Sequence, residues 1–257
     1  MIRALAAFVK ALAFLSLTLP LMPIQAALLR FKHPVAKDLP QIYHRMVCRI
    51  LRVELQIEGI VPSAGLIVAN HVSWLDIPAL SAAAKVSFVA KKDVAGWPFF
   101  GTLARLQNTV FVDRARKHST GQSRIEMLHR LKAGETLVLF PEGTSNNGRH
   151  LQPFKSTFFA AVEGTQIPIV PVTLIYQSQH GLPLTLRQWP SVAWYGDMGL
   201  LSHLWAALKY GPLKVRVIFH SALSLSELGH RKALAATAEM QIRQALAENL
   251  HQNSKMG

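Results

Sequence analysis

Short apolar runs, separated by amphipathic stretches, make up most of the chain after residue 50. The runs expected to be strands, most of them rich in β-branched residues, are Arg52–Ile57, Leu66–Ala69, Val86–Ala90, Thr109–Val112, Thr136–Phe140, Ile167–Leu174, Val192–Trp194 and Lys214–Phe219. Apolar positions at helical spacing lie between several of them, over Pro78–Ala84, Thr120–Ala133, Leu200–Tyr210 and Ser226–Leu250. This alternation predicts an α/β sandwich with a mostly parallel central sheet flanked by helices.

The first 50 residues follow a different pattern. The 19 residues from Ala11 to Leu29 are uncharged, which is about 28 Å of helix and close to the thickness of a bilayer core. Pro20 and Pro23 are expected to break or kink this helix, and basic residues flank it on both sides. A segment that dips into one leaflet, or lies at the interface, keeps both flanks on one anionic face. We favour that arrangement over a single span or a cleaved signal peptide.

Residues 39–50 mix apolar and basic positions at helical spacing and predict a second surface-seeking helix. We therefore expect membrane-associating helices over residues 1–50 and one folded, catalytic domain over residues 51–257. The composition agrees, because half of the 257 residues are apolar and only 16% are charged. The single cysteine, Cys48, lies in the second predicted helix, cannot form an intrachain disulfide and is expected to be a buried apolar residue.

The chain carries 28 Lys and Arg against 14 Asp and Glu, a net charge of +14. An excess of this size implies attraction to an anionic partner, such as nucleic acid, lipid headgroups or a phosphorylated substrate. No zinc-finger, RRM or helix-turn-helix pattern accompanies the basic residues, so we expect no nucleic acid. The histidines have no metal-ligand spacing, and we expect neither a metal nor a cofactor.

The most informative stretch is LIVANHVSWLDIP at residues 66–78. A buried strand is expected to end at Asn70 and His71, and Asp76 is placed to cap a helix whose first turn contains Pro78. Positions five apart on a continuous helix are separated by about 140°, so His71 and Asp76 must meet across a strand-to-helix turn. There the carboxylate would accept the imidazole N–H, fix the tautomer and stabilise the imidazolium.

Spacing alone leaves two interpretations of this pair open. In one, Asp76 is only a helix cap and His71 an ordinary histidine at the end of a strand. In the other, the two form a general base and its orienting partner. The chain has no GxSxG motif and no cysteine in a nucleophile pattern. A catalytic pair would therefore act on a nucleophile that the substrate supplies, such as a hydroxyl that attacks an activated acyl group.

Four ordered motifs resemble those of the glycerolipid acyltransferases of the PlsC type. They are NHxxxxD at 70–76, FVDR at 111–114, FPEGT at 140–144 and VP at 170–171. The resemblance covers roughly residues 50–220. It implies transfer of a fatty acyl group from acyl-carrier protein or coenzyme A to the free hydroxyl of a lysolipid, at the membrane and without a metal. The first acceptor it implies is 1-acyl-sn-glycerol-3-phosphate, which would give phosphatidic acid on the cytoplasmic face of the inner membrane.

The same resemblance assigns roles to single residues. It makes His71 the base that deprotonates the acceptor hydroxyl and Asp76 the partner that orients it. Lys91 and Arg114 look like electrostatic contacts for the acceptor's phosphate or headgroup, although either could be a solvated surface charge.

A second group of assigned residues lies in the turn of the third motif. Gly143 would let the backbone approach a ligand, and nearby N–H groups would stabilise the tetrahedral intermediate. Thr144 could donate a hydrogen bond to the substrate, and the carboxylate of Glu142 could bind the acceptor's polar head or orient its neighbours.

One position departs from the family pattern. Many members that act on phosphate acceptors carry Arg directly after Glu-Gly-Thr, and here that position is Ser145. Arg149 or Lys155 could reach the same anion, but serine cannot replace the guanidinium fork. The form FPEGTSNNG, with WYGDM at 194–198, is similar to members that act on lysophosphatidate and to others that act on lyso-ornithine lipid. The second acceptor, a zwitterionic lysolipid, therefore stays open.

Two other classes of function compete with the acyltransferase. A non-catalytic lipid-binding protein would keep the fold for its basic face and would bind vesicles in a salt-dependent way. A thioesterase would use the same histidine on water and release free fatty acid without a lysolipid.

Overall fold

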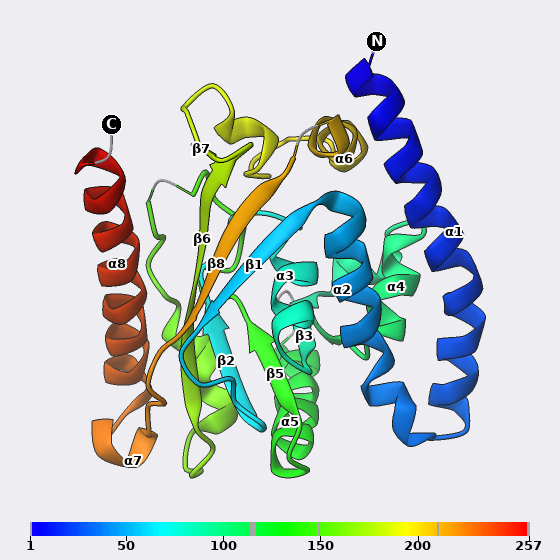
Figure 1. The fold of residues 1–257 in the computed structure, drawn as a ribbon. Helices are drawn as coiled ribbons and strands as arrows, with labels where there is room; N and C mark the ends of the chain where they lie inside the picture. The colour runs from blue at the N-terminus through cyan, green and yellow to red at the C-terminus, as the bar shows by residue number, and fades with distance from the viewer. Residues whose placement is uncertain (1, 114–116, 149, 210, 256–257) are drawn as a thin grey trace.

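One mixed sheet runs through the middle of the protein in the computed structural model, which describes residues 2–113, 117–148, 150–209 and 211–255 (Figure 1). Within these residues the strand order is β1-β8-β6-β2-β5-β3-β4, with β7 paired to β6. The strands are β1 (Val53–Glu58), β2 (Gly65–Ala69), β3 (Ser87–Lys91), β4 (Val110–Val112), β5 (Thr136–Leu139), β6 (Ile169–Gln179), β7 (Leu182–Pro183) and β8 (Leu213–Phe219). The pairs β6–β8 and β6–β7 are antiparallel and the others are parallel, which confirms the predicted mostly parallel sheet.

Helices cover both faces of this sheet (Figure 1). The helices are α1 (Ile2–Arg30), α2 (Leu39–Leu51), α3 (Asp76–Ala83), α4 (Phe100–Leu106), α5 (Lys117–Lys132), α6 (Leu200–Lys209), α7 (Leu225–Leu228) and α8 (Arg231–Lys255). On one side, α8 packs against β6. On the other side, α3 lies against the sheet, α2 packs on α3, and α1 contacts α2, α4 and α6. The N-terminal helices therefore form the outer layer of the α3 side.

Most predicted elements are present, within a few residues at each end, and two differ. The run Val192–Trp194 is not a strand, because its backbone is bonded elsewhere: Val192 N–H donates to Trp189 and Trp194 N–H to Val72. Val192 and Ala193 are apolar because they pack into the core, not because they pair in the sheet. The predicted helix Ser226–Leu250 is divided into α7 and α8 at Gly229, whose φ is +79°. Short elements such as α4 and β7 were not predicted, because they have too few residues to show a hydrophobic period.

The first helix is longer than its prolines led us to expect. It continues from Ile2 to Arg30 through Pro20 and Pro23. Both prolines are exposed, and each removes one backbone hydrogen bond without ending the helix, which packing against α2, α4 and α6 supports. Over Arg3–Arg30 this helix is apolar and long enough to cross a membrane by length and composition. Its exposed apolar side fits membrane association.

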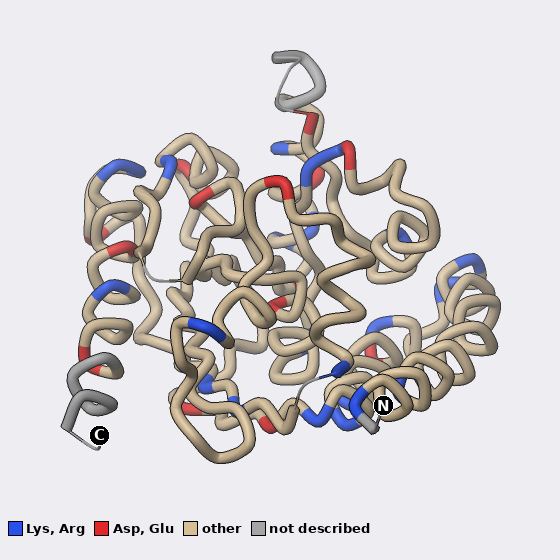
Figure 2. The backbone as a smooth tube through the Cα atoms, turned by 90° about the horizontal axis from the view of Figure 1, so that it is seen from above, with Lys and Arg blue, Asp and Glu red and all other residues tan. Residues whose placement is uncertain are grey.

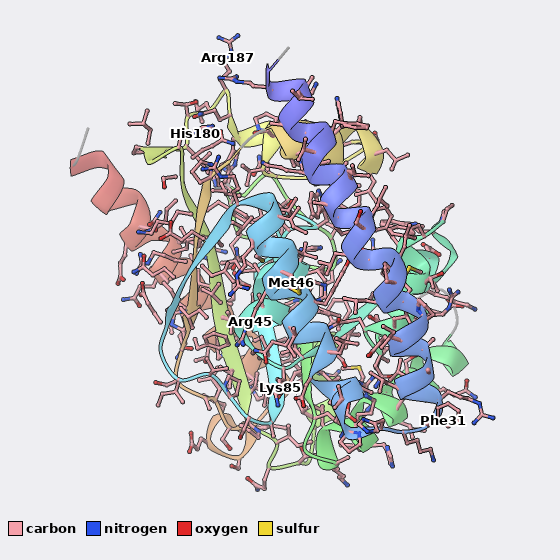
Figure 3. All side chains as sticks on the ribbon, turned by 45° about the vertical axis from the view of Figure 1, so that its right-hand side comes forward. Phe31, Arg45, Met46, Lys85, His180 and Arg187 are labelled. Atoms are coloured by element: carbon pink, nitrogen blue, oxygen red, sulfur yellow. The ribbon has the colours of Figure 1, made fainter. Side chains whose placement is uncertain are left out.

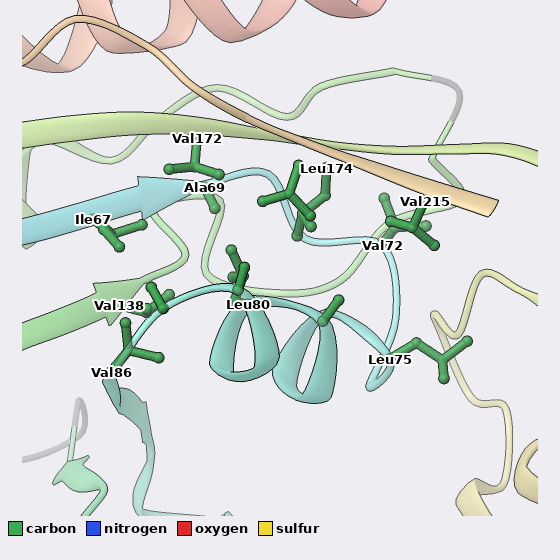
Figure 4. Close-up of a cluster of buried hydrophobic side chains, with 14 of the residues drawn as sticks. Ile67, Ala69, Val72, Leu75, Leu80, Val86, Val138, Val172, Leu174 and Val215 are labelled. Atoms are coloured by element: carbon green, nitrogen blue, oxygen red, sulfur yellow. The ribbon is translucent and has the colours of Figure 1, made fainter. Parts of the chain in front are cut away.

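Two hydrophobic clusters, one on each face of the sheet, form the core. The cluster on the α3 side is shown in Figure 4, where alternate residues of β2, Ile67 and Ala69, meet Leu80 of α3. The intervening residues, Leu66 and Val68, point to the cluster beneath α5 and α8. All five residues of β2 are buried, as expected for a central parallel strand covered on both faces.

The sheet brings two of the predicted motifs together. Strands β2 and β5 are parallel neighbours, with Val68 opposite Leu139. Their carboxyl ends therefore lie at one edge of the sheet, where ligands usually bind in α/β proteins. His71 follows β2 and Glu142 follows β5, so the first and third motifs meet at this edge.

Candidate active site

His71 leaves the end of β2 and turns toward the start of α3. Its Nδ1 lies 2.8 Å from Oδ2 of Asp76, so the two side chains meet across the strand-to-helix turn. Asp76 is completely buried, whereas 18% of the His71 side chain is exposed. Since Nδ1–H donates to the carboxylate, Nε2 is the ring nitrogen that can take a proton; it makes no hydrogen bond to any described residue.

Asp76 does not cap α3, contrary to our expectation. It is the first residue of the helix, and its carboxylate points back into the turn. Besides the imidazole, Oδ2 accepts the N–H groups of Val72 at 2.7 Å and Ser73 at 2.9 Å, and Oδ1 accepts the hydroxyl of Tyr176 at 2.5 Å. Asp76, inside the first turn of α3, thus accepts the N–H groups of two residues that follow the end of β2. The carboxylate is thus fixed by four donors in total.

Glu142 holds the backbone of His71 and is itself buried. Its Oε1 accepts the His71 N–H at 2.7 Å, while Oε2 accepts Gln152 N–H at 2.8 Å and the side-chain amide of Asn146 at 2.5 Å. Burial raises the pKa of Glu142, and these hydrogen bonds oppose the rise. Of the two roles that we expected for this carboxylate, the contacts present are those of the second, orientation of its neighbours.

The segment after β5 also holds the backbone carbonyl of His71. Asn146 N–H donates to the carbonyl of His71 at 3.0 Å, so Glu142 and Asn146 together fix both backbone groups of the histidine. Gly148 in this segment has φ +68° and packs closely on Trp189. A Cβ there would lie 2.5 Å from the Trp189 ring, so the position requires glycine. The indole N–H of Trp189 donates to the carbonyl of Asn147.

The imidazole is also held by an aromatic neighbour. Phe140, the last residue before the third-motif turn, stacks on His71 with ring centroids 4.1 Å apart and planes at 16°. Since the carboxylate fixes one ring nitrogen and the stack fixes the plane, the direction of Nε2 is set before a substrate arrives. Pre-set direction of this kind is what a general base needs.

The other predicted residues divide into three groups. Gly143 is buried with φ +82°, and its N–H already donates to Phe140 at 3.0 Å, so that N–H is not a free donor for an oxyanion. Thr144 beside it is exposed, and its hydroxyl makes no hydrogen bond among the described residues. Lys91, at the end of β3, and Lys155 are exposed. The predicted contacts Arg114 and Arg149 lie outside the described residues.

Three side chains of the site were not predicted: Tyr176, Asn146 and the stacking ring of Phe140. Tyr176 had a signal, because in β6 it follows Val172 and Leu174 on the same face and brings a hydroxyl to an otherwise aliphatic row. Asn146 had none, because a loop asparagine is common in turns.

A large apolar cavity lies beside the pair. Its volume is about 980 Å³, and its walls come mainly from α1, α2, α4 and α6. Trp74, Ile77 and Pro78, from the turn and helix that carry Asp76, are among the residues that line it. Trp74 is held by His203 of α6, whose Nδ1 accepts the indole N–H at 2.9 Å. Burial lowers the pKa of His203, which keeps the ring neutral and able to accept.

These parts allow one kind of chemistry in particular. A neutral imidazole with a fixed tautomer can take a proton from a hydroxyl, and the buried carboxylate can stabilise the imidazolium that forms. The neighbouring cavity has the size and apolar lining of a site for a long hydrocarbon chain.

Comparison with known proteins adds to this geometry. The Acyltransferase family matches residues 52–175, which include all four motifs and β6 as far as Ile175. A lyso-ornithine lipid O-acyltransferase of Brucella abortus is 37% identical over 97% of this chain and 97% of its own length. A 1-acyl-sn-glycerol-3-phosphate acyltransferase of Neisseria meningitidis is 33% identical over 73% of this chain and 71% of its own length.

A solved structure has the same fold. The 1-acyl-sn-glycerophosphate acyltransferase PlsC of Thermotoga maritima superposes with a TM-score of 0.70 over 96% of this chain and 94% of its own, at 20% identity. The match includes the N-terminal helices, because it leaves out only 4% of this chain.

Proposed function

We propose a mechanism from the premise that this chain belongs to the PlsC-type acyltransferase family and transfers acyl groups to lysolipids. In it, His71 is the general base and Asp76 its orienting partner. The observation that carries this assignment is the 2.8 Å contact between Nδ1 and a carboxylate that three further donors hold in place.

The reaction needs no protein nucleophile. Nε2 of His71 takes the proton of the acceptor hydroxyl as its oxygen attacks the carbonyl carbon of the acyl thioester. The tetrahedral intermediate then loses the thiolate, and the imidazolium returns the proton to that sulfur. Asp76 stabilises the imidazolium between these two steps. Thr144, exposed in the third-motif turn, is the donor that we place near the developing oxyanion.

The apolar cavity is where we place a fatty acyl chain. Its lining from α1 and α4 is apolar except for a few side chains, and Trp74, in the turn that carries the pair, also lines it. A chain that lies there would bring its thioester end toward His71.

The donor and the location follow the same proposal. The donor is an acyl thioester of acyl-carrier protein or coenzyme A, and no cofactor or metal takes part. Residues 1–50 associate with the membrane and residues 51–257 carry the catalytic machinery, on the cytoplasmic face of the inner membrane, where those thioesters are found. The exposed apolar side of α1 supports the membrane contact.

Lyso-ornithine lipid is the acceptor that we now favour. Ser145 stands where many phosphate-acceptor relatives carry Arg, and the segment that follows it is tied to Trp189 and His71. The Brucella relative of that specificity aligns along almost the whole chain. Lysophosphatidate is the second candidate, supported by the Neisseria relative over a shorter length.

A direct assay tests both parts of the proposal. Purified protein is given a labelled acyl thioester with a panel of lysolipids, lyso-ornithine lipid and lysophosphatidate among them, and products are identified by mass spectrometry. We expect a diacylated ornithine lipid as the main product and a loss of at least about 10³-fold in kcat for His71→Ala. A normal rate in His71→Ala would refute the base, and free fatty acid without an acylated lipid would make the protein a hydrolase.

Ser145→Arg tests the acceptor assignment separately. The new guanidinium should raise kcat/KM for lysophosphatidate relative to lyso-ornithine lipid by about tenfold or more. Ser145→Gln adds a polar side chain without charge and serves as the matched control. If both variants keep the original ratio, position 145 does not read the headgroup.

A further inference from the structure

We propose that Tyr176 is a positioning residue of the catalytic pair, and that its hydroxyl holds the oxygen of Asp76 that does not face His71. This inference rests on the proposed role of His71 as the base. The Tyr176 hydroxyl lies 2.5 Å from Oδ1, while Oδ2 receives the imidazole at 2.8 Å. The two oxygens of one carboxylate are thus held by two different elements, β6 and the turn after β2.

The fold explains why a tyrosine can reach this point. Val172, Leu174 and Tyr176 lie on the face of β6 that packs toward α3, and Asp76 begins that helix. The pairing of β6 with β8 shifts register directly after Tyr176, between it and Ser178. A bulge next to an active site re-aims the side chains around it. Trp189 lies edge-on to the phenol, with ring centroids 6.5 Å apart.

The hydroxyl is a donor at every pH at which the enzyme would work. Burial raises the pKa of Tyr176 well above its usual value, and the neighbouring Asp76 raises it further. Cys48 of α2 also faces the phenol, but burial raises the pKa of its thiol to about 12, so it is neutral. On the histidine side, Glu142 accepts the backbone N–H of His71 and also interacts electrostatically with His71.

Two consequences follow for catalysis. The hydrogen bond prevents the carboxylate from rotating, so the imidazole keeps the direction that a general base needs. It also draws negative charge toward Oδ1 and away from the imidazole. Removing the hydroxyl leaves more charge facing His71, which favours the imidazolium. The acid limb of the pH–rate profile should then move to higher pH.

Tyr176→Phe tests the inference because it removes only the hydroxyl. We expect kcat to fall about ten- to hundredfold, the effect of losing a hydrogen bond to a charged group, with KM for thioester and lysolipid changed less than about twofold. We expect the midpoint of the acid limb in the pH profile of kcat to move to higher pH by about half a unit or more. In proton NMR, the Nδ1–H resonance of His71, identified by its loss in His71→Ala, should shift in Tyr176→Phe.

Tyr195→Phe is the matched control. Tyr195 packs against the same core cluster, and its hydroxyl makes no hydrogen bond among the described residues. Its rate, pH profile and NMR resonance should equal those of the natural protein. Thermal unfolding of both variants shows whether either one has lost its fold.

The outcomes separate this inference from the proposed function. If His71→Ala abolishes turnover but Tyr176→Phe leaves kcat, the acid limb and the Nδ1–H resonance unchanged, Tyr176 has no positioning role. A lower kcat with an unmoved acid limb and resonance would also overturn it, because that is the behaviour of a purely structural residue. Within Asp76→Asn protein, Tyr176→Phe should reduce the remaining rate by less than twofold, and an undiminished effect would mean that it acts elsewhere. A normal rate in His71→Ala would instead reject the base itself.

Discussion

His71 is held at more points than a side-chain pair requires. Asp76 fixes its ring nitrogen, Phe140 fixes its plane, and Glu142 and Asn146 fix the two polar groups of its backbone. The backbone contacts come from the third motif, which follows a different strand. The first and third motifs therefore act as one unit, and a change in the third should be felt at the base.

Glu142→Gln should lower turnover more than substrate binding. The carboxamide can still accept the His71 N–H, but its NH₂ would then face the donors of Asn146 and Gln152. We expect kcat to fall about tenfold or more, KM to change less than about threefold, and the free energy of unfolding to drop by about 1–3 kcal/mol. Steady-state kinetics and denaturant unfolding measure these quantities.

Thr144→Val provides the contrast in the same turn. Thr144 is exposed and bonded to no described residue, so this change should affect kinetics and leave the unfolding curve unchanged. A Glu142→Gln protein with normal kcat and a raised KM for the lysolipid would mean that Glu142 binds the acceptor.

At the scale of elements, α2 and α3 are joined by a partly buried polar contact. Nδ1 of His44 lies 2.9 Å from Oγ of Ser81, and burial lowers the pKa of His44 to about 4. Its ordinary value is about 6.5. Between these two values the unfolded chain binds a proton that the folded chain does not. The α2–α3 contact is therefore stable above pH 6.5 and becomes weaker as the pH falls toward 4.

We expect the free energy of unfolding to fall by up to about 3 kcal/mol between pH 7 and pH 4 because of His44. His203 and His220, whose pKa values burial also lowers, should add to the slope. His44→Gln should make the slope smaller, measured as the midpoint of thermal unfolding at each pH. His230→Gln, at an exposed position, should leave the slope as it was. Equal slopes in the two variants would show that His44 titrates normally.

The apolar cavity lined by α1 and α4 should determine which acyl chain lengths are transferred. Leu103 of α4 lines the cavity, and Leu103→Trp would fill part of its volume. We expect kcat/KM for long-chain thioesters to fall by about tenfold relative to short-chain ones, in competition assays read by mass spectrometry. Ile125→Trp, at an exposed position on α5, is the control. An unchanged preference in Leu103→Trp would place the acyl chain elsewhere.

For the molecule as a whole, the positive charge and the apolar helix face have different distributions. Lys and Arg are spread over several helices and loops rather than gathered in one patch (Figure 2). The exposed large apolar side chains gather on α1 and on the turn to α2, where Phe31 is 80% exposed (Figure 3). Arg45 and Met46 are neighbours on α2, and Nε of Arg45 donates to the carbonyl of Ala82 in α3 (Figure 3). The apolar side can enter a membrane while the net charge attracts it to anionic lipid.

Leu12→Asp combined with Leu19→Asp should separate these two contributions. Both leucines are exposed on α1, so we expect the fold to persist and vesicle binding to fall by more than about tenfold. Sedimentation with vesicles that contain anionic lipid measures the binding. Met240→Asp, exposed on α8 across the sheet, should bind as the natural protein does. High salt should weaken the remaining attachment. Full binding by the double variant would show that α1 is not the membrane contact.

The pattern of residues along the chain was sufficient for much of the fold. Continuous apolar runs such as Leu66–Ala69 and Thr136–Phe140 indicated buried parallel strands, because burial on both faces leaves no room for polar positions. Segments whose conformation depends on particular tertiary contacts were predicted wrongly. Val192–Trp194 has a strand-like composition, but its N–H groups bond to a neighbouring turn and to Val72.

The sequence by itself determined the chemistry. A histidine and an aspartate lie five residues apart, and three further motifs follow them in the order that acyltransferases share, on an apolar and basic chain. Only the tertiary structure decided how that pair is held. Tyr176 and Glu142 are 100 and 66 positions from Asp76, and both reach the same turn because β2 is paired with β5 and β6 in parallel. Local periodicity carries no information about such contacts, since chain closure over long separations depends on the packing of the whole sheet.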